Sequence, residues 1–422
     1  MTRRRAKLFE AKQRVTYAGS RRASAALVAV LLFCGGQVSA ATDWRDERWT
    51  VEGFTNALSG GPEGGPVEQA GGGSRGLCED DAGRLFLLGG QFIDIVTPTG
   101  LRMRLAGSGT VGYRDGPAKD AQFRFGEGAY YGVYNIACGP NGVFVSDGGN
   151  RRVRRIFSGE GGWRVSTWAG GGKSRMKPGE TGRPLDAGFS GTITVAAAPS
   201  GELTVADSYG AYRVSADGTA ITYLGPWPES TIAKPGKPPT LNVVMGDADS
   251  RGFVYFVSRT PDFVIRIHPT GKIEHLAGIL FGRERPTWIG DGPPREVYFD
   301  TPSTVVARPD GSAVYVCGGD EYDIRRVPTD GQGTTATLMQ NGRWYKASVH
   351  PNRSRGPALF RPNAEGRLKP DGELTDLMVT HLLGRDASGN LYGSLFPWVG
   401  MTQVVEGEGP LGTKIFRLRQ VP

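Results

Sequence analysis

The chain has 422 residues, with 65 glycines, 28 prolines and 38% apolar residues. Glycine supplies the positive φ angles of tight turns, so this composition favours many short strands and argues against a disordered chain. The formal charge of +8 is concentrated at the N-terminus, because residues 1–40 alone carry +7 and leave +1 for residues 41–422. Residues 41–422 therefore offer no electrostatic argument for nucleic-acid binding, and nucleic acid is not an expected partner.

Residues 1–40 have the features of a cleavable export signal. A basic stretch ending in Arg21-Arg22 precedes an apolar segment, residues 25–33, and residues 38–40 suit a signal peptidase. The apolar segment is shorter than the roughly 20 residues of a membrane span. We therefore expect a periplasmic or extracellular protein with no stable membrane span after cleavage. An uncleaved N-terminal anchor and twin-arginine export are the alternatives.

A glycine-containing turn followed at once by an apolar strand recurs six times. The turn glycines are Gly83, Gly142, Gly201, Gly252, Gly311 and Gly389, at intervals of 59, 59, 51, 59 and 78 residues. This period suits a four-stranded propeller blade with its loops. Alternating apolar residues in the repeated pieces indicate strands with one face packed against a neighbouring blade.

The second unit, residues 141–154, carries the fullest motif. Its strand ends at Asp147, and a small-residue turn leads into Asn150-Arg151-Arg152. This segment resembles the NHL repeat, and residues 201–207 repeat its first half. The resemblance spans about residues 75–420 and implies an all-β fold, a six-bladed β-propeller of four-stranded NHL-like blades. We interpret three polar residues as closing turns through side-chain hydrogen bonds, namely Asp147, Asn150 and Asp207.

The two ends of the chain predict how the ring closes. The sixth unit finishes with a third strand, residues 414–419, and a strand-like piece, residues 48–52, lies near the mature N-terminus. Pairing these two strands would complete the last blade and remove exposed sheet edges. The predicted organisation is a signal peptide (1–40), an N-terminal strand with a glycine-rich linker (41–75) and the propeller (76–422).

A basic, irregular insertion, residues 340–376, interrupts the period. Long loops in compact domains are often functional, and arginine and aromatic side chains dominate many interfaces. A surface loop packed by its own aromatics is the alternative. The candidate partner-binding residues are Trp344, Tyr345, Arg353 and Arg355.

Three cysteines remain after export, Cys78, Cys138 and Cys317. Cys78 and Cys138 fall on comparable innermost strands of consecutive units, so a disulfide between them is one alternative. We favour buried free cysteines that act as small apolar side chains.

The central channel of the predicted propeller offers a candidate site, because the innermost strand of each blade lines it. The channel-mouth candidates are Asn135, Thr194, Asn242, Thr304 and His381, with Glu79 on the first inner strand. The amide, hydroxyl and carboxylate oxygens of these residues could hold a hard cation such as calcium, as similar propellers of the gluconolactonase and paraoxonase type do. A water-filled channel is favoured, because the set contains one carboxylate.

Two functions follow from these features. The NHL resemblance implies a scaffold that binds a protein or glycan through its loop faces. The alternative is a metal-dependent hydrolase or lyase at the channel mouth. The four histidines are scattered, and the sequence has no P-loop, dinucleotide fingerprint or nucleophile elbow, so catalysis is the less favoured function.

Overall fold

Antiparallel sheets make up the computed structural model. It describes residues 48–53, 76–96, 102–125, 135–228, 240–259, 261–279, 291–299, 301–318, 323–339, 379–395 and 415–421. These ranges contain six sheets and no α-helix, and none of their helical turns has the length and apolar character of a membrane span. The predicted signal peptide and the 340–376 insertion, with Trp344, Tyr345, Arg353 and Arg355, lie outside the described residues.

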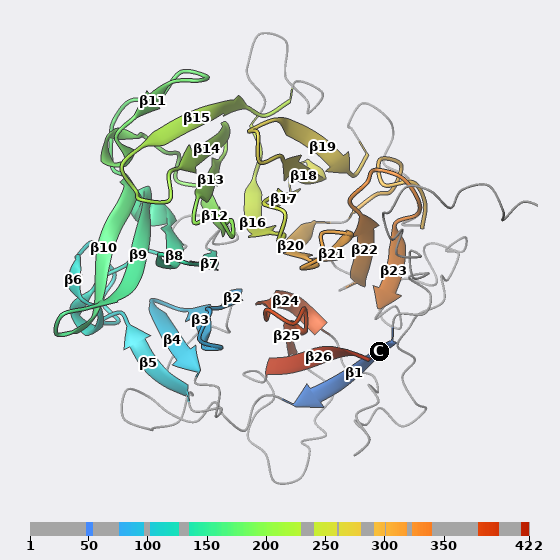
Figure 1. Cartoon of the computed structure of the whole chain (residues 1–422), viewed down its shortest axis with the longest axis horizontal. Coiled ribbons are helices and arrows are strands. Elements are labelled where there is room, and N and C mark those ends of the chain that lie inside the picture. The colour runs from blue at the N-terminus through green and yellow to red at the C-terminus, as the bar shows by residue number, and fades with distance from the viewer. Residues whose placement is uncertain are drawn as a thin grey trace, which may run out of the picture. The chain divides into compact units, whose positions relative to one another are not determined.

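Each sheet is one blade, and the strands of the first three blades follow in chain order (Figure 1). Blade 1 contains β2 (Gly76–Glu79), β3 (Leu85–Gly89), β4 (Phe92–Val96) and β5 (Arg102–Ala106). Blade 2 contains β7 (Ile136–Gly139), β8 (Gly142–Asp147), β9 (Arg152–Gly159) and β10 (Gly162–Gly170). Blade 3 contains β12 (Ile193–Ala197), β13 (Leu203–Asp207), β14 (Gly210–Val214) and β15 (Ile221–Pro226).

Blades 4 and 5 repeat the same order, and blade 6 takes its fourth strand from the N-terminus. Blade 4 contains β16 (Val243–Ala248), β17 (Val254–Arg259), β18 (Asp262–Ile267) and β19 (Ile273–Ala277). Blade 5 contains β20 (Pro302–Ala307), β21 (Ala313–Gly318), β22 (Asp323–Pro328) and β23 (Ala336–Met339). Blade 6 contains β24 (Val379–Arg385), β25 (Leu391–Leu395), β26 (Ile415–Val421) and β1 (Arg48–Gly53).

The first strands of the blades form an inner ring. In this ring β2, β7, β12, β16, β20 and β24 each contact the next, and β24 contacts β2. Figure 1 shows these six labels nearest the common centre of the sheets. The last contact is tight, because Gly384 of β24 lies so close to the carbonyl of Leu77 that a Cβ would not fit. The predicted six-bladed propeller is confirmed.

The predicted closure of the ring is also confirmed. β1 pairs antiparallel with β26, from Arg48 opposite Val421 to Gly53 opposite Phe416. The N-terminal strand thus supplies the fourth strand of blade 6, and it pairs with the strand that would otherwise end the sheet.

Two blades have a fifth strand that the sequence did not predict. β6 (Gly116–Pro117) pairs with β10, and β11 (Thr181–Gly182) pairs with β15. Each is two residues long and belongs to the connection that enters its own blade. A two-residue strand has no alternating pattern, so periodicity could not reveal it.

Apolar side chains fill the spaces between blades, and alternation along one strand serves two neighbours. On β8, Val143 belongs to the core cluster that contains Phe86 of blade 1, while the adjacent Phe144 belongs to the cluster that contains Val195 of blade 3. All four are buried. Burying a side chain of this size contributes about 1.5–3 kcal/mol, so the period-two pattern stabilises the ring blade by blade.

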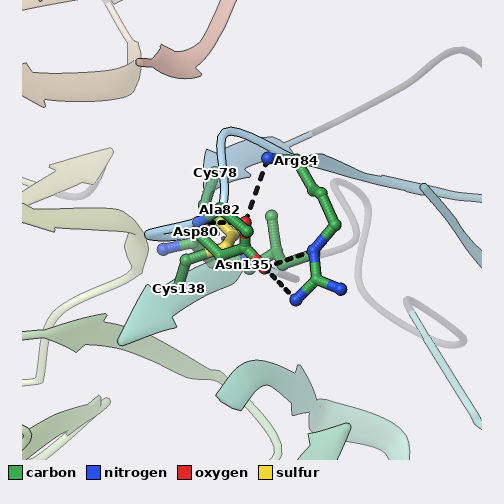
Figure 2. The surroundings of a disulfide bond; sticks show 7 residues. Cys78, Asp80, Ala82, Arg84, Asn135 and Cys138 are labelled. Carbon is green, nitrogen blue, oxygen red and sulfur yellow. Dashed lines mark hydrogen bonds and ion pairs between the residues drawn. A yellow bond between two sulfur atoms is a disulfide. The ribbon is translucent and has the colours of Figure 1, made fainter. Parts of the chain in front are cut away.

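The interpretation of the cysteines as free thiols is wrong for two of them. Cys78 on β2 and Cys138 on β7 form a disulfide with a Cα–Cα distance of 5.4 Å (Figure 2). Consecutive inner strands converge on the axis, which brings equivalent positions within bonding distance. Cys317 is buried and lies outside the disulfide.

Candidate functional site

The Asn135 side chain crosses the inner ring. This buried residue immediately precedes β7, and its Nδ2 donates to the carbonyl of Val195 on β12 at 2.7 Å and to that of Gly246 on β16 at 2.9 Å. Its Oδ1 accepts the backbone N–H of Ile136 at 2.8 Å. One amide therefore links blades 2, 3 and 4, and both ends of it are engaged by protein groups.

The other predicted channel residues occupy similar strand positions in their blades. Thr194 and Thr304 are buried on β12 and β20, and the Thr194 hydroxyl has no hydrogen-bond partner among the described residues. Asn242 is half-buried just before β16, and its carbonyl accepts the N–H of Arg259 at 3.0 Å. His381 lies on β24 opposite Ser394, and its side chain is outside the described residues.

Glu79 lies at the opposite end of the inner ring. It is the last residue of β2, whereas Gly76, the first, lies beside Asn135. Three residues of strand span about 10 Å, so Glu79 and Asn135 do not face the same mouth. The Glu79 carboxylate accepts the N–H of Ala387 at 2.5 Å, and burial, reinforced by Asp386 and Asp80, raises the pKa of Glu79.

The predicted calcium site therefore has no carboxylate at the mouth that carries Asn135 and Thr194. In the described part of the chain, no group of three or more His, Cys, Asp or Glu side chains is placed to hold a metal ion. The calcium ligands remain a prediction that rests on amide and hydroxyl oxygens.

A second cross-channel link, which the sequence analysis missed, joins blades 4 and 6. Arg385 Nε lies 3.4 Å from Asp247 Oδ2, and its Nη2 donates to the carbonyl of Ala248 at 2.9 Å. Asp247 also accepts the N–H of Ala307 at 2.9 Å. Burial raises the pKa of Asp247, and Arg385 opposes that shift. The signal was a single aspartate in the apolar strand Val243–Ala248.

Strand-ending aspartates tie the loop that enters a blade to the turn between its second and third strands. Asp207 accepts the N–H groups of Ser190, Tyr209 and Gly210 at 3.0, 2.9 and 3.2 Å. Asp147 accepts the N–H of Arg124 at 2.8 Å. These bonds are the turn and loop closures that the sequence predicted for such aspartates.

The buried Arg154 extends the same network in blade 2. Its Nη1 lies 2.7 Å from Asp147 Oδ2, with both side chains fully buried, and its Nη2 lies 2.7 Å from Asp115 Oδ1. Asn150 donates to Asp147 at 2.9 Å and to the carbonyl of Gly112 at 2.7 Å. Asp147, Asn150 and Arg154 are therefore engaged in holding blade 2 to its entering loop.

A cleft opens between blades 2 and 3 on the face where the inner strands begin. Its volume is about 550 Å³, and it is lined by the β8–β9 turn, the β10–β12 connection and Tyr209 of the β13–β14 turn. We call it the basic cleft. Its charged lining residues are Arg151, Arg152, Lys173 and Arg175. None of the described lining residues is acidic.

The cations of the basic cleft are largely exposed. Arg151, Lys173 and Arg175 have no ion pair among the described residues, and Arg175 lies over the Tyr209 ring at 3.0 Å from its centroid. Arg152 is half-buried and donates to the carbonyl of Asn150 at 2.8 Å. No sequence motif predicted this cleft, because three separate segments form it: the β8–β9 turn, the β10–β12 connection and the β13–β14 turn.

Comparison with known proteins supports the fold. No protein-family model and no curated protein sequence matches the chain. An auxiliary nutrient binding protein from Bacteroides thetaiotaomicron is similar in structure, with 13% identity, a TM-score of 0.52, and coverage of 89% of this chain and 77% of that one. One from Bacteroides ovatus has 14% identity, a TM-score of 0.51, and coverage of 89% and 78%. At such identities the likeness concerns the propeller fold alone.

Proposed function

We propose that the chain is an exported propeller of NHL-type repeats that binds a protein or glycan through its loop face without converting it. The basic cleft is the observation that carries this proposal. Its three exposed cations have no ion pair among the described residues, whereas Asn135 and Arg385 in the channel already bond to backbone or carboxylate groups across the ring. A surface charge without a protein partner is available to a ligand.

The disulfide supports export. Disulfides form and persist in oxidising compartments such as the periplasm and the extracellular space, and they are rare in the cytosol. Cys78–Cys138 therefore suits the predicted cleavage after residue 40. The names of the two Bacteroides proteins describe nutrient binding, which agrees with the proposed binding function.

The insertion 340–376 is a second proposed contact of the same binding function. Its candidates, Trp344, Tyr345, Arg353 and Arg355, combine aromatic and guanidinium groups of the type found in interface hot spots.

The test is a binding screen of the exported protein against immobilised glycans and secreted proteins, followed by mass spectrometry of the bound ligand. We expect saturable binding of at least one ligand, recovered with unchanged mass. A ligand recovered as cleavage or elimination products would establish the hydrolase or lyase alternative. The absence of any saturable ligand would overturn the binding function.

A further inference from the structure

We propose that the basic cleft binds an acidic saccharide, whose carboxylates pair with Arg151, Lys173 and Arg175. This inference rests on the proposed binding function and gives it a ligand class and a place. The argument combines the charge, the size and the side-chain chemistry of the cleft with the backbone conformation at Arg151.

The charge of the cleft favours an anion. Three exposed cations and the half-buried Arg152 face one opening. Two carboxylates beside the cleft are buried and engaged by protein groups. Asp207 accepts three backbone N–H groups, and Asp147 accepts from the lining residue Asn150 and pairs with Arg154. Burial raises the pKa of Asp207, and the Arg175 charge opposes that shift. These buried carboxylates leave an excess of positive charge at the surface, and arginine pairs well with planar carboxylates.

The size of the cleft favours an organic ligand over a single ion. A volume of about 550 Å³ lies in the range of sites for small organic ligands, roughly 300–1,000 Å³. A water-sized particle occupies only about 30 Å³. The cationic groups come from both blades, Arg151 from the β8–β9 turn and Lys173 and Arg175 from the β10–β12 connection. A ligand with several separated anionic groups can engage them together.

The uncharged lining suits a sugar better than a peptide. The residues other than the cations are glycines, Asn150, Ser190 and two aromatic residues, Phe189 and Tyr209, with no aliphatic side chain in the described lining. Most peptides are held along a sheet edge or in apolar grooves, and this cleft is formed by turns and connections. Acidic peptides are also recognised by arginine clusters, and the tetraglutamate probe below tests that case. The Asn150 amide and the Ser190 hydroxyl already donate to protein groups, so the cations and the Tyr209 ring are the lining groups that would meet a sugar.

Arg151 holds its side chain at the rim in an unusual backbone conformation. Its φ of 53° and ψ of 43° are left-handed, a region that is rare for residues other than glycine. Such conformations cost about 1–2 kcal/mol and cluster at ligand sites, where an outlier supports a functional hypothesis. The strained arginine is therefore an observation independent of the charge.

The experiment compares three probes by isothermal titration calorimetry with the full exported chain. The probes are tetragalacturonate, neutral maltotetraose and tetraglutamate peptide. We expect saturable binding of tetragalacturonate that weakens as salt is raised, at least tenfold weaker binding of the other two, and at least a tenfold loss in the double variant K173E/R175E.

Arg164→Glu is the matched control. Arg164 is exposed on β10 of the same blade, outside the cleft, so this variant changes charge without touching the lining. We expect its affinity to stay within twofold of the original. The neutral pair K173Q/R175Q, with circular dichroism of every variant, separates loss of a contact from loss of fold.

Three outcomes would overturn the inference. Tetraglutamate binding as tightly as tetragalacturonate would remove the saccharide assignment. Equal losses in K173E/R175E and R164E would remove the cleft, because the effect would then be one of net charge. No affinity for tetragalacturonate, in a protein that binds another glycan or protein in the screen above, would leave the binding function standing and discard this ligand class.

Discussion

The inner ring and the basic cleft both carry polar side chains, and they differ in what those side chains bond to. In the ring, Asn135 and Arg385 reach across to carbonyls of β16, and Asp247 accepts from Ala307. In the cleft, Arg151 and Lys173 point to no carboxylate of the described chain. A buried polar group without a hydrogen bond costs free energy, so most, like Asn135, are bonded within the fold, whereas an exposed charge is solvated by water.

This difference separates stability from binding. A substitution in the ring is expected to lower the free energy of unfolding and leave ligand affinity unchanged. A substitution in the cleft is expected to lower ligand affinity with a smaller effect on the free energy of unfolding. The following predictions test that separation, from the largest expected change in stability to the smallest.

Loss of the disulfide is expected to cost the most stability. Cys78 and Cys138 are 60 residues apart. On the chain-entropy account, a disulfide that closes a loop of that length stabilises the fold by about 4 kcal/mol, so its removal lowers the free energy of unfolding by that amount. Urea denaturation of the Cys78→Ser/Cys138→Ser variant should show this loss, with tetragalacturonate affinity unchanged. Reductant should not affect the variant further. Equal midpoints for the oxidised protein and the variant would contradict the prediction.

His275 gives a pH-dependent change of the next size. It is buried in blade 4, with its ring 4.7 Å from that of Phe263, and burial lowers its pKa from 6.5 to about 4. The unfolded chain therefore binds a proton first as the pH falls below 6.5. Stability is full above that pH and falls until about pH 4, by up to about 3 kcal/mol.

The measurement is the free energy of unfolding from pH 7 to pH 4 for the original protein and for His275→Gln. Carboxylates titrate in both proteins, so the difference between the two curves isolates the histidine. We expect the original to lose more stability than the variant across this window. Parallel curves would show that His275 is not held neutral by burial.

Removing the Asn135 amide tests the ring directly. Asn135→Ala leaves the carbonyls of Val195 and Gly246 without its donated bonds, which is expected to cost about 2 kcal/mol. Binding in the cleft should stay within twofold. Asn141→Ala is the control, because that half-buried amide donates one bond, to Ala216, and should cost less. A variant with full stability that lost turnover of a ligand would instead favour the catalytic alternative.

The repeat and the closure of the ring were predictable because short sequence patterns specify them. The turn glycines recur at a blade-length period, and residues 48–52 have a strand pattern with no other partner. The disulfide could be proposed but not preferred, because spacing alone does not show that two inner strands converge to 5.4 Å at Cys78 and Cys138.

The cleft was beyond sequence reasoning for a different reason. Its cations come from the β8–β9 turn with the first residue of β9 and from the β10–β12 connection. The distance between these segments depends on how two blades pack, and arginine in such segments is normal on a solvated surface. The pairing of Asp247 with Arg385 was hidden likewise, since these residues are far apart in the chain and meet across the axis. Pair contacts between distant segments leave no period to detect.

Arg151→Gly is expected to change stability the least and in the opposite direction. Glycine adopts the φ of 53° without strain, and the relief of about 1–2 kcal/mol is partly offset by the greater entropy of glycine in the unfolded chain, about 0.5–1 kcal/mol. The free energy of unfolding of the variant should therefore be equal to that of the original protein or higher by up to about 1 kcal/mol, which urea denaturation measures. Its affinity for tetragalacturonate should fall, because one cation of the cleft is gone. Arg164→Gly, on strand β10, should lose stability and keep affinity. A stabilised Arg151→Gly variant with undiminished affinity would show that the strained arginine serves neither the fold nor the ligand.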